Sequence, residues 1–278
     1  METYLIPILS MGGLGALLAS ILVLADSKLR VKEDPNIDLV EEELPGANCG
    51  ACGYPGCRQF AEQVVAGNLD PTECRPSSPE AIQAIAGILG IEVEVGIPLK
   101  ARIMCLGGKA ESETRSEYAG VEDCRAAALV GGGNKGCVYG CLGFGSCVES
   151  CPFGAMRMDA NGLPEINDDL CTGCGICTEA CPKKIIDLVR EGEKVLLGCS
   201  SPEKAKAVKE VCSRGCIGCS LCAKVCPVDA IVMDGNLPVI DQEKCTACGD
   251  CIDRCPTDSL LEPQINHILL IKRKKKAV

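Results

Sequence analysis

The chain has 278 residues, a formal net charge of −10, 24 cysteines, 3% aromatic residues and no tryptophan. So few large apolar side chains exclude a core built mainly on aromatic packing, and the acidic charge argues against nucleic acid as a partner. This cysteine content predicts disulfides in an oxidising compartment or metal sites in a reducing one.

An uncharged apolar run at the N-terminus, residues 4–25, is the first predicted element. About 20 apolar residues suffice for a helix to cross a bilayer, so we expect a single transmembrane anchor. A secretory signal would have basic residues before the run, but Glu2 precedes it, and Lys28, Arg30 and Lys32 follow it. The positive-inside rule leaves the N-terminus outside the cell membrane and everything after the anchor on the cytoplasmic side. The small residues of GGLGALLAS either admit a second helix or face lipid.

The charged segments near the two ends predict solvated chain. Residues 33–43 are strongly acidic and lead to a Pro-Gly pair, which is typical of a linker. The KRKKK run near the C-terminus either contacts anionic lipid or forms a solubilising tail. His267, the only histidine, stands in an apolar stretch, and a core or surface role is favoured over metal ligation.

Three cysteine runs share the spacing C-x2-C-x2-C-x3-C-P. This is the bacterial ferredoxin signature, in which three thiolates ligate one [4Fe–4S] cubane and the fourth ligates its partner cubane. A zinc site uses four ligands, usually in two separated pairs, and does not need the Cys-Pro end. The runs hold Cys171, Cys174, Cys177 and Cys181; Cys216, Cys219, Cys222 and Cys226; and Cys245, Cys248, Cys251 and Cys255.

A looser fourth run, CVYGCLGFGSCVESCP, spans residues 137–151 and keeps the Cys-Pro end. Segments of strand, Asn/Gly turn and return strand follow both Cys151 and Cys226, so two ferredoxin-like modules stand in tandem. Cross-ligation predicts four clusters: Cys137, Cys141, Cys147 and Cys181; Cys171, Cys174, Cys177 and Cys151; Cys216, Cys219, Cys222 and Cys255; and Cys245, Cys248, Cys251 and Cys226.

A different quartet lies upstream, in NCGACGYPGC with Cys49, Cys52 and Cys57, and it closes with Cys74 after a predicted helix in RQFAEQVVAG. Its glycines let the backbone wrap closely around a cluster and donate N–H groups to sulfur. We interpret it as a fifth [4Fe–4S] site, and a zinc knuckle is the alternative.

Four cysteines remain outside these runs, and they form two similar pairs. Each pair has one cysteine after an apolar strand and one on a predicted helix, and Ser200 to Glu203 predicts the start of the second helix. We hypothesise that the two units associate and enclose a sixth cubane, whereas the alternative is four buried free thiols. The pairs are Cys105 with Cys124 and Cys199 with Cys212.

The predicted fold is α+β, with one N-terminal transmembrane helix, a small four-Cys iron–sulfur domain and two tandem ferredoxin-like modules. No glycine run matches a nucleotide-binding motif, so electron relay through clusters is favoured over catalysis on this chain. The expected divisions are 1–27, the anchor; 28–46, the acidic linker; 47–92, the four-Cys domain; 93–136, the insert with Cys105 and Cys124; 137–198, module 1; 199–263, the insert with Cys199 and Cys212 plus module 2; and 264–278, the basic tail.

The order of these elements carries a family resemblance. A single span, an acidic linker, CGACGYPGC with its distant Cys74, and CVYGCLGFGSCVESCPFGA before tandem ferredoxin modules closely resemble the B subunit of the Rnf complex, the membrane-bound ferredoxin:NAD+ oxidoreductase. The resemblance covers essentially the whole chain. Some members have one ferredoxin module, so this chain resembles a longer variant with more clusters.

The resemblance implies a translocase component that takes electrons from soluble reduced ferredoxin and relays them to membrane and flavin-carrying subunits, which reduce NAD+ while Na+ or H+ is exported. It implies that the 20 cysteines of the five quartets are cluster ligands. Two rival functions stay open: an electron-carrying component of another membrane oxidoreductase, such as a hydrogenase, and an iron–sulfur sensor or storage module. The CGACGYPGC block also resembles part of corrinoid-dependent enzymes, but the span and the tandem modules favour the Rnf complex.

Overall fold

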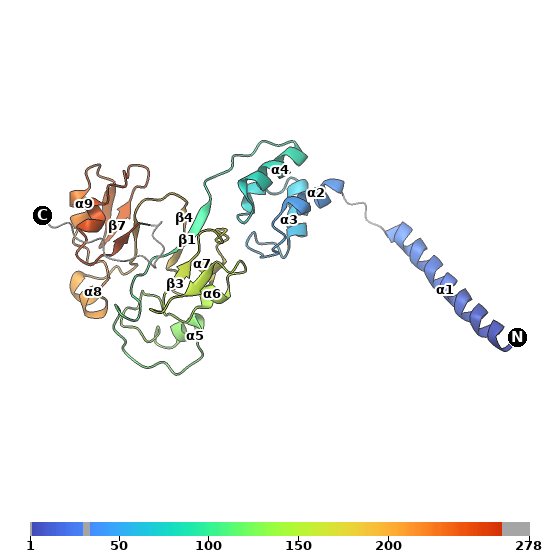
Figure 1. Ribbon diagram of the computed structural model, residues 1–278, viewed down its shortest axis with the longest axis horizontal. Coiled ribbons are helices and arrows are strands. Elements are labelled where there is room, and N and C mark those ends of the chain that lie inside the picture. Colours follow the sequence, from blue (N-terminus) through green and yellow to red (C-terminus); the bar gives the residue numbers. More distant parts are fainter. Residues whose placement is uncertain (1, 30–33, 263–278) are drawn as a thin grey trace.

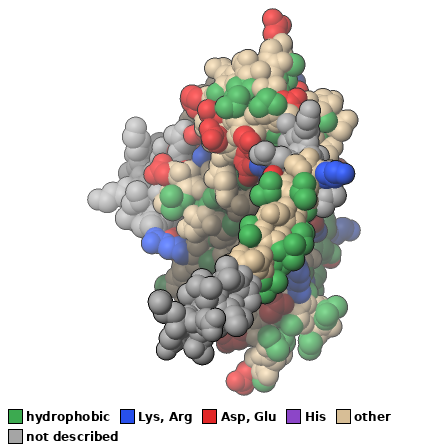
Figure 2. Space-filling model, turned by 90° about the vertical axis from the view of Figure 1, so that its right-hand side faces the viewer, with side chains coloured by type: hydrophobic (Ala, Val, Ile, Leu, Met, Phe, Trp, Pro, Cys, Tyr) green, Lys and Arg blue, Asp and Glu red, His purple; other side chains and the backbone are tan. Residues whose placement is uncertain are grey.

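A computed structural model describes residues 2–29 and 34–262 of the chain. The first helix, α1 (Glu2–Leu29), projects away from the other elements (Figure 1). Its segment Met11–Lys28 has a mean hydropathy of 1.4, and none of that segment is buried inside the molecule. Hydrophobic side chains are visible along this helix in the turned view (Figure 2). A helix with this length and exposed apolar surface has the properties of a membrane anchor.

The expected solvated linker is wrong over much of its length, because residues 35–43 form helix α2 (Pro35–Glu43). The Asp34 carboxylate caps this helix by accepting a hydrogen bond of 2.9 Å from the Asn36 N–H. Most of the acidic side chains are exposed, whereas Ile37 and Val40 are buried. The acidic segment is therefore an amphipathic helix that packs in the core of the next domain, and not a linker.

The four-Cys domain is helical and has its own apolar core. Helix α2 packs against α3 and α4, and Val40, Phe60 and Ile85 meet in this core. The predicted helix in RQFAEQVVAG is confirmed as α3, and the Ser78 hydroxyl caps α4 by accepting from the Ala81 N–H. The remaining elements are α3 (Cys57–Val65), η1 (Pro71–Glu73) and α4 (Pro79–Leu89).

Each ferredoxin-like module contains one antiparallel hairpin and two short helices that carry cysteines. The hairpins predicted after Cys151 and Cys226 are confirmed. Module 1 holds α6 (Ser146–Glu149), β2 (Met156–Met158), β3 (Pro164–Ile166) and α7 (Ile176–Ala180). Module 2 holds α9 (Leu221–Val225), β6 (Ile231–Asp234), β7 (Leu237–Ile240) and α10 (Asp250–Asp253).

Each module also contains a second two-stranded sheet. One strand of that sheet comes from the segment that precedes the cysteine runs of the module. In module 1, β1 pairs antiparallel with β4, and in module 2, β5 pairs antiparallel with β8. The strand that precedes Cys105 and the strand that precedes Cys199 therefore occupy equivalent places. These strands are β1 (Leu99–Ile103), β4 (Ile186–Arg190), β5 (Leu196–Leu197) and β8 (Leu260–Leu261).

Helices α5 (Cys124–Leu129) and α8 (Ala205–Val211) follow these strands, as predicted, but α8 begins later than its sequence suggested. Ser200 does not cap it, because the Ser200 hydroxyl donates to the Met104 carbonyl at 2.9 Å instead. That bond joins the segment after β5 to the end of β1. The predicted basic tail, including His267, lies outside the described residues.

Candidate metal centres

Quartet A consists of the four cysteines of the helical domain and keeps its predicted membership. All four line one hollow beside Phe60. The Asn48 side chain fixes the entry to α3, because its Oδ1 accepts from the Cys57 N–H at 2.8 Å. Burial raises the pKa of the Cys74 thiol. The members are Cys49, Cys52, Cys57 and Cys74.

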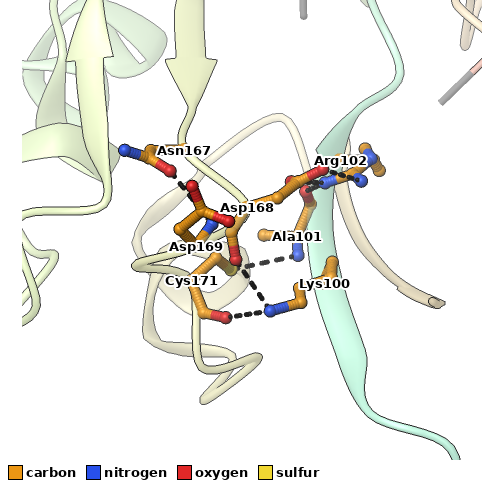
Figure 3. A network of polar contacts seen from close by, with 7 residues as sticks. All are labelled: Lys100, Ala101, Arg102, Asn167, Asp168, Asp169 and Cys171. Atoms are coloured by element: carbon orange, nitrogen blue, oxygen red, sulfur yellow. Dashed lines mark hydrogen bonds and ion pairs between the residues drawn. The ribbon is translucent and has the colours of Figure 1, made fainter. Parts of the chain in front are cut away.

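Quartet B also groups as predicted, because Cys177 lies near the thiols of Cys171, Cys174 and Cys151. Strand β1 holds its loop in place (Figure 3). The Lys100 ammonium donates to the carbonyls of Asp168 and Cys171 at 2.7 and 2.9 Å, and the Arg102 guanidinium makes two bonds to the Asp168 carboxylate at 2.6 and 2.8 Å. The Ala101 N–H points at the Cys171 sulfur, 3.4 Å away. Strand β1 therefore orients a predicted ligand.

Quartet C differs from the prediction in one member. Cys141, Cys147 and Cys181 line a common hollow, and the fourth cysteine of that hollow is Cys124 rather than Cys137. Cys124 is the first residue of α5, and a hydrogen-bonded link ties this end of the helix to α6. The Cys124 N–H donates to the Ser146 hydroxyl at 2.8 Å, and that hydroxyl donates to the Asp123 carboxylate at 2.7 Å.

The junction quartet, quartet D, takes the displaced cysteine. One hollow between the two modules is lined by Cys105, Cys137, Cys199 and Cys212. This hollow differs from the predicted sixth site in one cysteine, because α5 places Cys124 in the hollow of quartet C. The association of the two strand–helix units that this site required does occur: the Ser213 N–H donates to the Glu111 carbonyl at 2.9 Å, and the Glu113 N–H to the Val211 carbonyl at 3.0 Å.

One of two glycines beside the junction quartet allows close approach of a sulfur to the backbone. A Cβ atom at Gly107 would stand 3.0 Å from the Cys212 sulfur and 3.8 Å from the Cys105 sulfur. A Cβ atom at Gly140 would stand 3.6 Å from the Cys137 sulfur and 3.7 Å from the Cys105 sulfur. Gly107 therefore leaves room for the Cys212 sulfur, whereas the contacts at Gly140 are of ordinary van der Waals length.

We expect Gly107→Ala to destabilise the chain by about 1–3 kcal/mol and to lower the iron content of the junction quartet, because the new methyl group overpacks the Cys212 sulfur. Thermal melting and iron analysis of the anaerobically purified variant measure both effects. Gly87→Ala is the matched control, because that exposed glycine lies inside α4 with nothing within 4 Å of its added Cβ. Equal melting and equal iron in the two variants would contradict the close packing at Gly107.

Quartet E in module 2 groups as predicted, as do three cysteines of quartet F, and the fourth, Cys226, packs in the same apolar core. The four cysteines of quartet E line one hollow, and Cys251 of quartet F lies close to Cys245 and Cys248. The Lys194 ammonium donates to the carbonyls of Gln242 and Cys245, which repeats the Lys100 arrangement of module 1. Quartet E is Cys216, Cys219, Cys222 and Cys255; quartet F is Cys226, Cys245, Cys248 and Cys251.

Several thiols are strongly disfavoured as free thiolates. Burial raises the pKa of Cys141 and of Cys177 to about 12, and neighbouring thiols add to the rise. Burial likewise raises the pKa of Cys147, Cys216 and Cys251 to about 11. Without a bound cation these groups stay protonated at neutral pH, so metal ligation must displace their protons.

The quartets fit [4Fe–4S] clusters. Backbone N–H groups point at the sulfurs of Cys105, Cys226 and Cys255 at 3.3–3.4 Å, as they do in sites that stabilise negatively charged clusters. A zinc ion at about 2.3 Å from each sulfur would hold four sulfurs roughly 4 Å apart. Within residues 2–29 and 34–262, no three His, Cys, Asp or Glu side chains are close enough to hold one metal ion. The thiols line hollows wider than a single-ion site.

The six quartets form a row in which each lies beside the next. Cys49 of quartet A lies near Cys174 of quartet B, and Cys177 of quartet B lies near Cys147 of quartet C. The Cys141 N–H of quartet C donates to the Cys105 sulfur of the junction quartet at 3.4 Å.

The row continues through module 2. Cys199 of the junction quartet lies near Cys216 of quartet E. Cysteines of quartets E and F then share one apolar core. The four cysteines outside the ferredoxin runs are thus divided between quartet C and the junction quartet, and the junction quartet stands between the two modules.

Lysines were the residues that the sequence interpretation missed. Lys100 and Lys194 both lie close before a predicted strand–cysteine segment, and this repeated position was the available signal. Lys135, two residues before Cys137, is buried beside the junction quartet. Nothing in the local sequence distinguishes it from a surface lysine.

Comparison with protein families supports this architecture. Residues 44–76 match a family described as "Putative Fe-S cluster", which covers quartet A. Residues 136–185 and 215–259 match a family described as "4Fe-4S dicluster domain", and residues 163–227 match a second family with the same description. The matched segments contain most of the cysteines of quartets B, C, E and F.

Relatives cover most of the chain. The chain is 43% identical over 248 residues to the B subunit of a proton-translocating ferredoxin:NAD+ oxidoreductase complex from Clostridium ljungdahlii, covering 89% of this chain and 87% of the relative. It is 39% identical over 245 residues to the B subunit of the Na+-translocating complex from Acetobacterium woodii, covering 88% and 74%. It is 42% identical over 237 residues to the B subunit of an ion-translocating oxidoreductase complex from Methanosarcina acetivorans, covering 85% and 90%. The chain therefore belongs to the family of the B subunits of the Rnf complex, the ion-translocating ferredoxin:NAD+ oxidoreductase.

Proposed function

We propose that this chain is the iron–sulfur electron-transfer component of an Rnf complex, that it holds six [4Fe–4S] clusters in quartets A to F, and that it connects soluble ferredoxin with the other subunits. The observation that carries this proposal is the unbroken row of thiol quartets. Bound [4Fe–4S] clusters supply one-electron redox chemistry, while the chain sets their order, burial and hydrogen bonding. Family membership supports the same function.

The exposure of the thiols favours a direction along the row. Cys219 of quartet E and Cys248 of quartet F are exposed, so module 2 offers the accessible end for a soluble donor. Quartet A belongs to the domain that follows the anchor in the sequence. We infer that reduced ferredoxin docks at module 2 and that electrons leave near the membrane, where the flavin-carrying subunits would receive them.

The sidedness follows from the basic residues after the span. Lys28, Arg30 and Lys32 favour a cytoplasmic position for everything beyond the anchor, with the N-terminus outside. In that arrangement the six quartets share a compartment with soluble ferredoxin. The reducing cytoplasm also keeps their thiols available for cluster assembly.

Anaerobic purification followed by iron, sulfide and zinc analysis tests the cluster content. We expect about 24 irons and equal sulfide per chain, because each cubane contains four of each. About 20 irons would contradict the sixth cluster, and stoichiometric zinc with little iron would overturn the electron-transfer function. In membranes that contain the complex, reduced ferredoxin should then reduce these clusters, and added NAD+ should reoxidise them. Passage of electrons to a hydrogenase, but not to NAD+, would contradict the assignment.

A further inference from the structure

Lys135 is a buried cation that the quartets themselves do not explain. Its residue is only 7% exposed, and its ammonium donates to the Gly107 carbonyl at 2.8 Å. Its own carbonyl accepts from the Arg115 Nε at 3.0 Å, which fixes the backbone at this point. Lys135 is therefore held in one place beside the junction quartet rather than reaching into solvent.

The charge of Lys135 has no carboxylate partner within the described part of the chain. A buried ammonium is costly unless a negative group nearby compensates for it. The Gly107 carbonyl that Lys135 binds lies beside the junction sulfurs, since a Cβ atom at Gly107 would stand 3.8 Å from the Cys105 sulfur. The Cys105 sulfur in turn accepts from the Cys141 N–H at 3.4 Å. These two cysteines belong to different quartets, so the ammonium lies where the junction quartet meets quartet C.

Ligated thiolates supply the missing negative charge. A cubane with four thiolates is anionic, and it becomes more negative by one charge on reduction. A fixed positive charge in a buried setting stabilises the more negative form more strongly, because Coulomb interactions are weakly screened there. A cation at this place therefore favours the reduced state of both neighbouring sites.

We propose that Lys135 raises the reduction potentials at the junction quartet and quartet C. Electrons that arrive from module 2 can therefore reduce the sites through which they pass to module 1. This inference rests on the proposed function, since it requires both quartets to hold clusters. Lys135 acts through its charge on the sites and ligates nothing itself.

Potentiometric titration of the anaerobically purified full chain, followed by electron paramagnetic resonance, tests the proposal with Lys135→Met. This variant removes the charge and keeps most of the apolar stem. The junction signal is identified beforehand as the one missing from Cys212→Ser. We expect that signal to require a more negative potential, so that at the wild-type midpoint its reduced-to-oxidised ratio falls about tenfold.

Two variants serve as controls. Lys135→Arg keeps the charge and should keep the wild-type ratio to within about twofold. Lys209→Met removes an exposed charge from α8, where solvent screens it, and should also leave the ratio nearly unchanged. Full iron in Lys135→Met with an unshifted junction signal would overturn the role of Lys135 while leaving the cluster content intact.

Iron analysis distinguishes a failure of this proposal from a failure of the proposed function on which it rests. About 20 irons in the wild-type chain would show that the junction quartet is empty, and both proposals would fall together. Loss of iron from Lys135→Met with full iron in Lys135→Arg would show that the charge is needed for assembly, which contradicts a role in setting the potential. Loss of iron from both variants would indicate a packing role and would also overturn the proposal.

Discussion

Replacing Cys212 with serine is expected to remove about four irons per chain and to stop electron flow between the two ferredoxin-like modules. The junction quartet lies between quartets C and E, beside quartet C through the Cys141–Cys105 hydrogen bond and beside quartet E through Cys199 and Cys216. With this site lost, module 2 should still be reduced by ferredoxin, while quartets A to C should stay oxidised. Ferredoxin:NAD+ activity of the complex should fall to background.

A set of single variants tests the membership of the sites. Cys137→Ser should abolish the same resonance signal as Cys212→Ser, because both cysteines line the junction hollow. Cys124→Ser should abolish a different signal, the one lost in Cys181→Ser. Ser213→Ala, at an exposed neighbour of Cys212, is the matched control and should retain all the iron. If Cys124→Ser and Cys212→Ser abolished one signal, the exchange of Cys124 and Cys137 would be wrong.

The thiol groupings that agree between sequence and structure are those fixed by short spacing. In C-x2-C-x2-C-x3-C-P the local chain alone dictates that three sulfurs converge, and the pairing of the fourth follows from the hairpin repeat. Quartets B, E and F therefore needed no tertiary information. Quartet A was also predictable, because Cys74 returns to its partners through one short helix.

The exchange of Cys124 and Cys137 could not be predicted in the same way. The stretch from Cys141 to Cys147 is longer than the standard spacing, which was a signal that this run departs from the ferredoxin pattern. The identity of the replacement depends on the Asp123–Ser146 contact, which joins residues 23 positions apart. No local rule specifies such a contact, and the two cysteines are equally plausible ligands by type.

Helix α2 shows a different limit. Its net acidity resembles that of a linker, and only the spacing of Ile37 and Val40 indicates a buried face. That face is buried because it packs against Phe60 and Ile85, which come later in the chain and lie in the same core. The predicted linker boundary was wrong because the charge of a surface helix was interpreted as the absence of structure.

Removing the clusters is expected to unfold the two modules while sparing much of the helical four-Cys domain. The cores of both modules consist largely of the cysteines themselves and a few aliphatic residues. Structural zinc in small peptides contributes about 10–16 kcal/mol, comparable with the roughly 5–15 kcal/mol that stabilises a whole domain. The folding free energy of these modules should therefore come mostly from ligation.

The four-Cys domain provides an internal comparison, because Val40, Phe60 and Ile85 give it an apolar core that is almost fully buried. After anaerobic treatment with a chelator and an oxidant, amide hydrogen exchange should be fast in β2, β3, β6 and β7 but still slowed in α2 and α4. Circular dichroism should show a loss of the cooperative melt of the modules with part of the helical signal retained. A cooperative, native-like melt of the iron-free chain, with protected hairpins, would show that apolar packing holds the modules and that the clusters serve electron transfer alone.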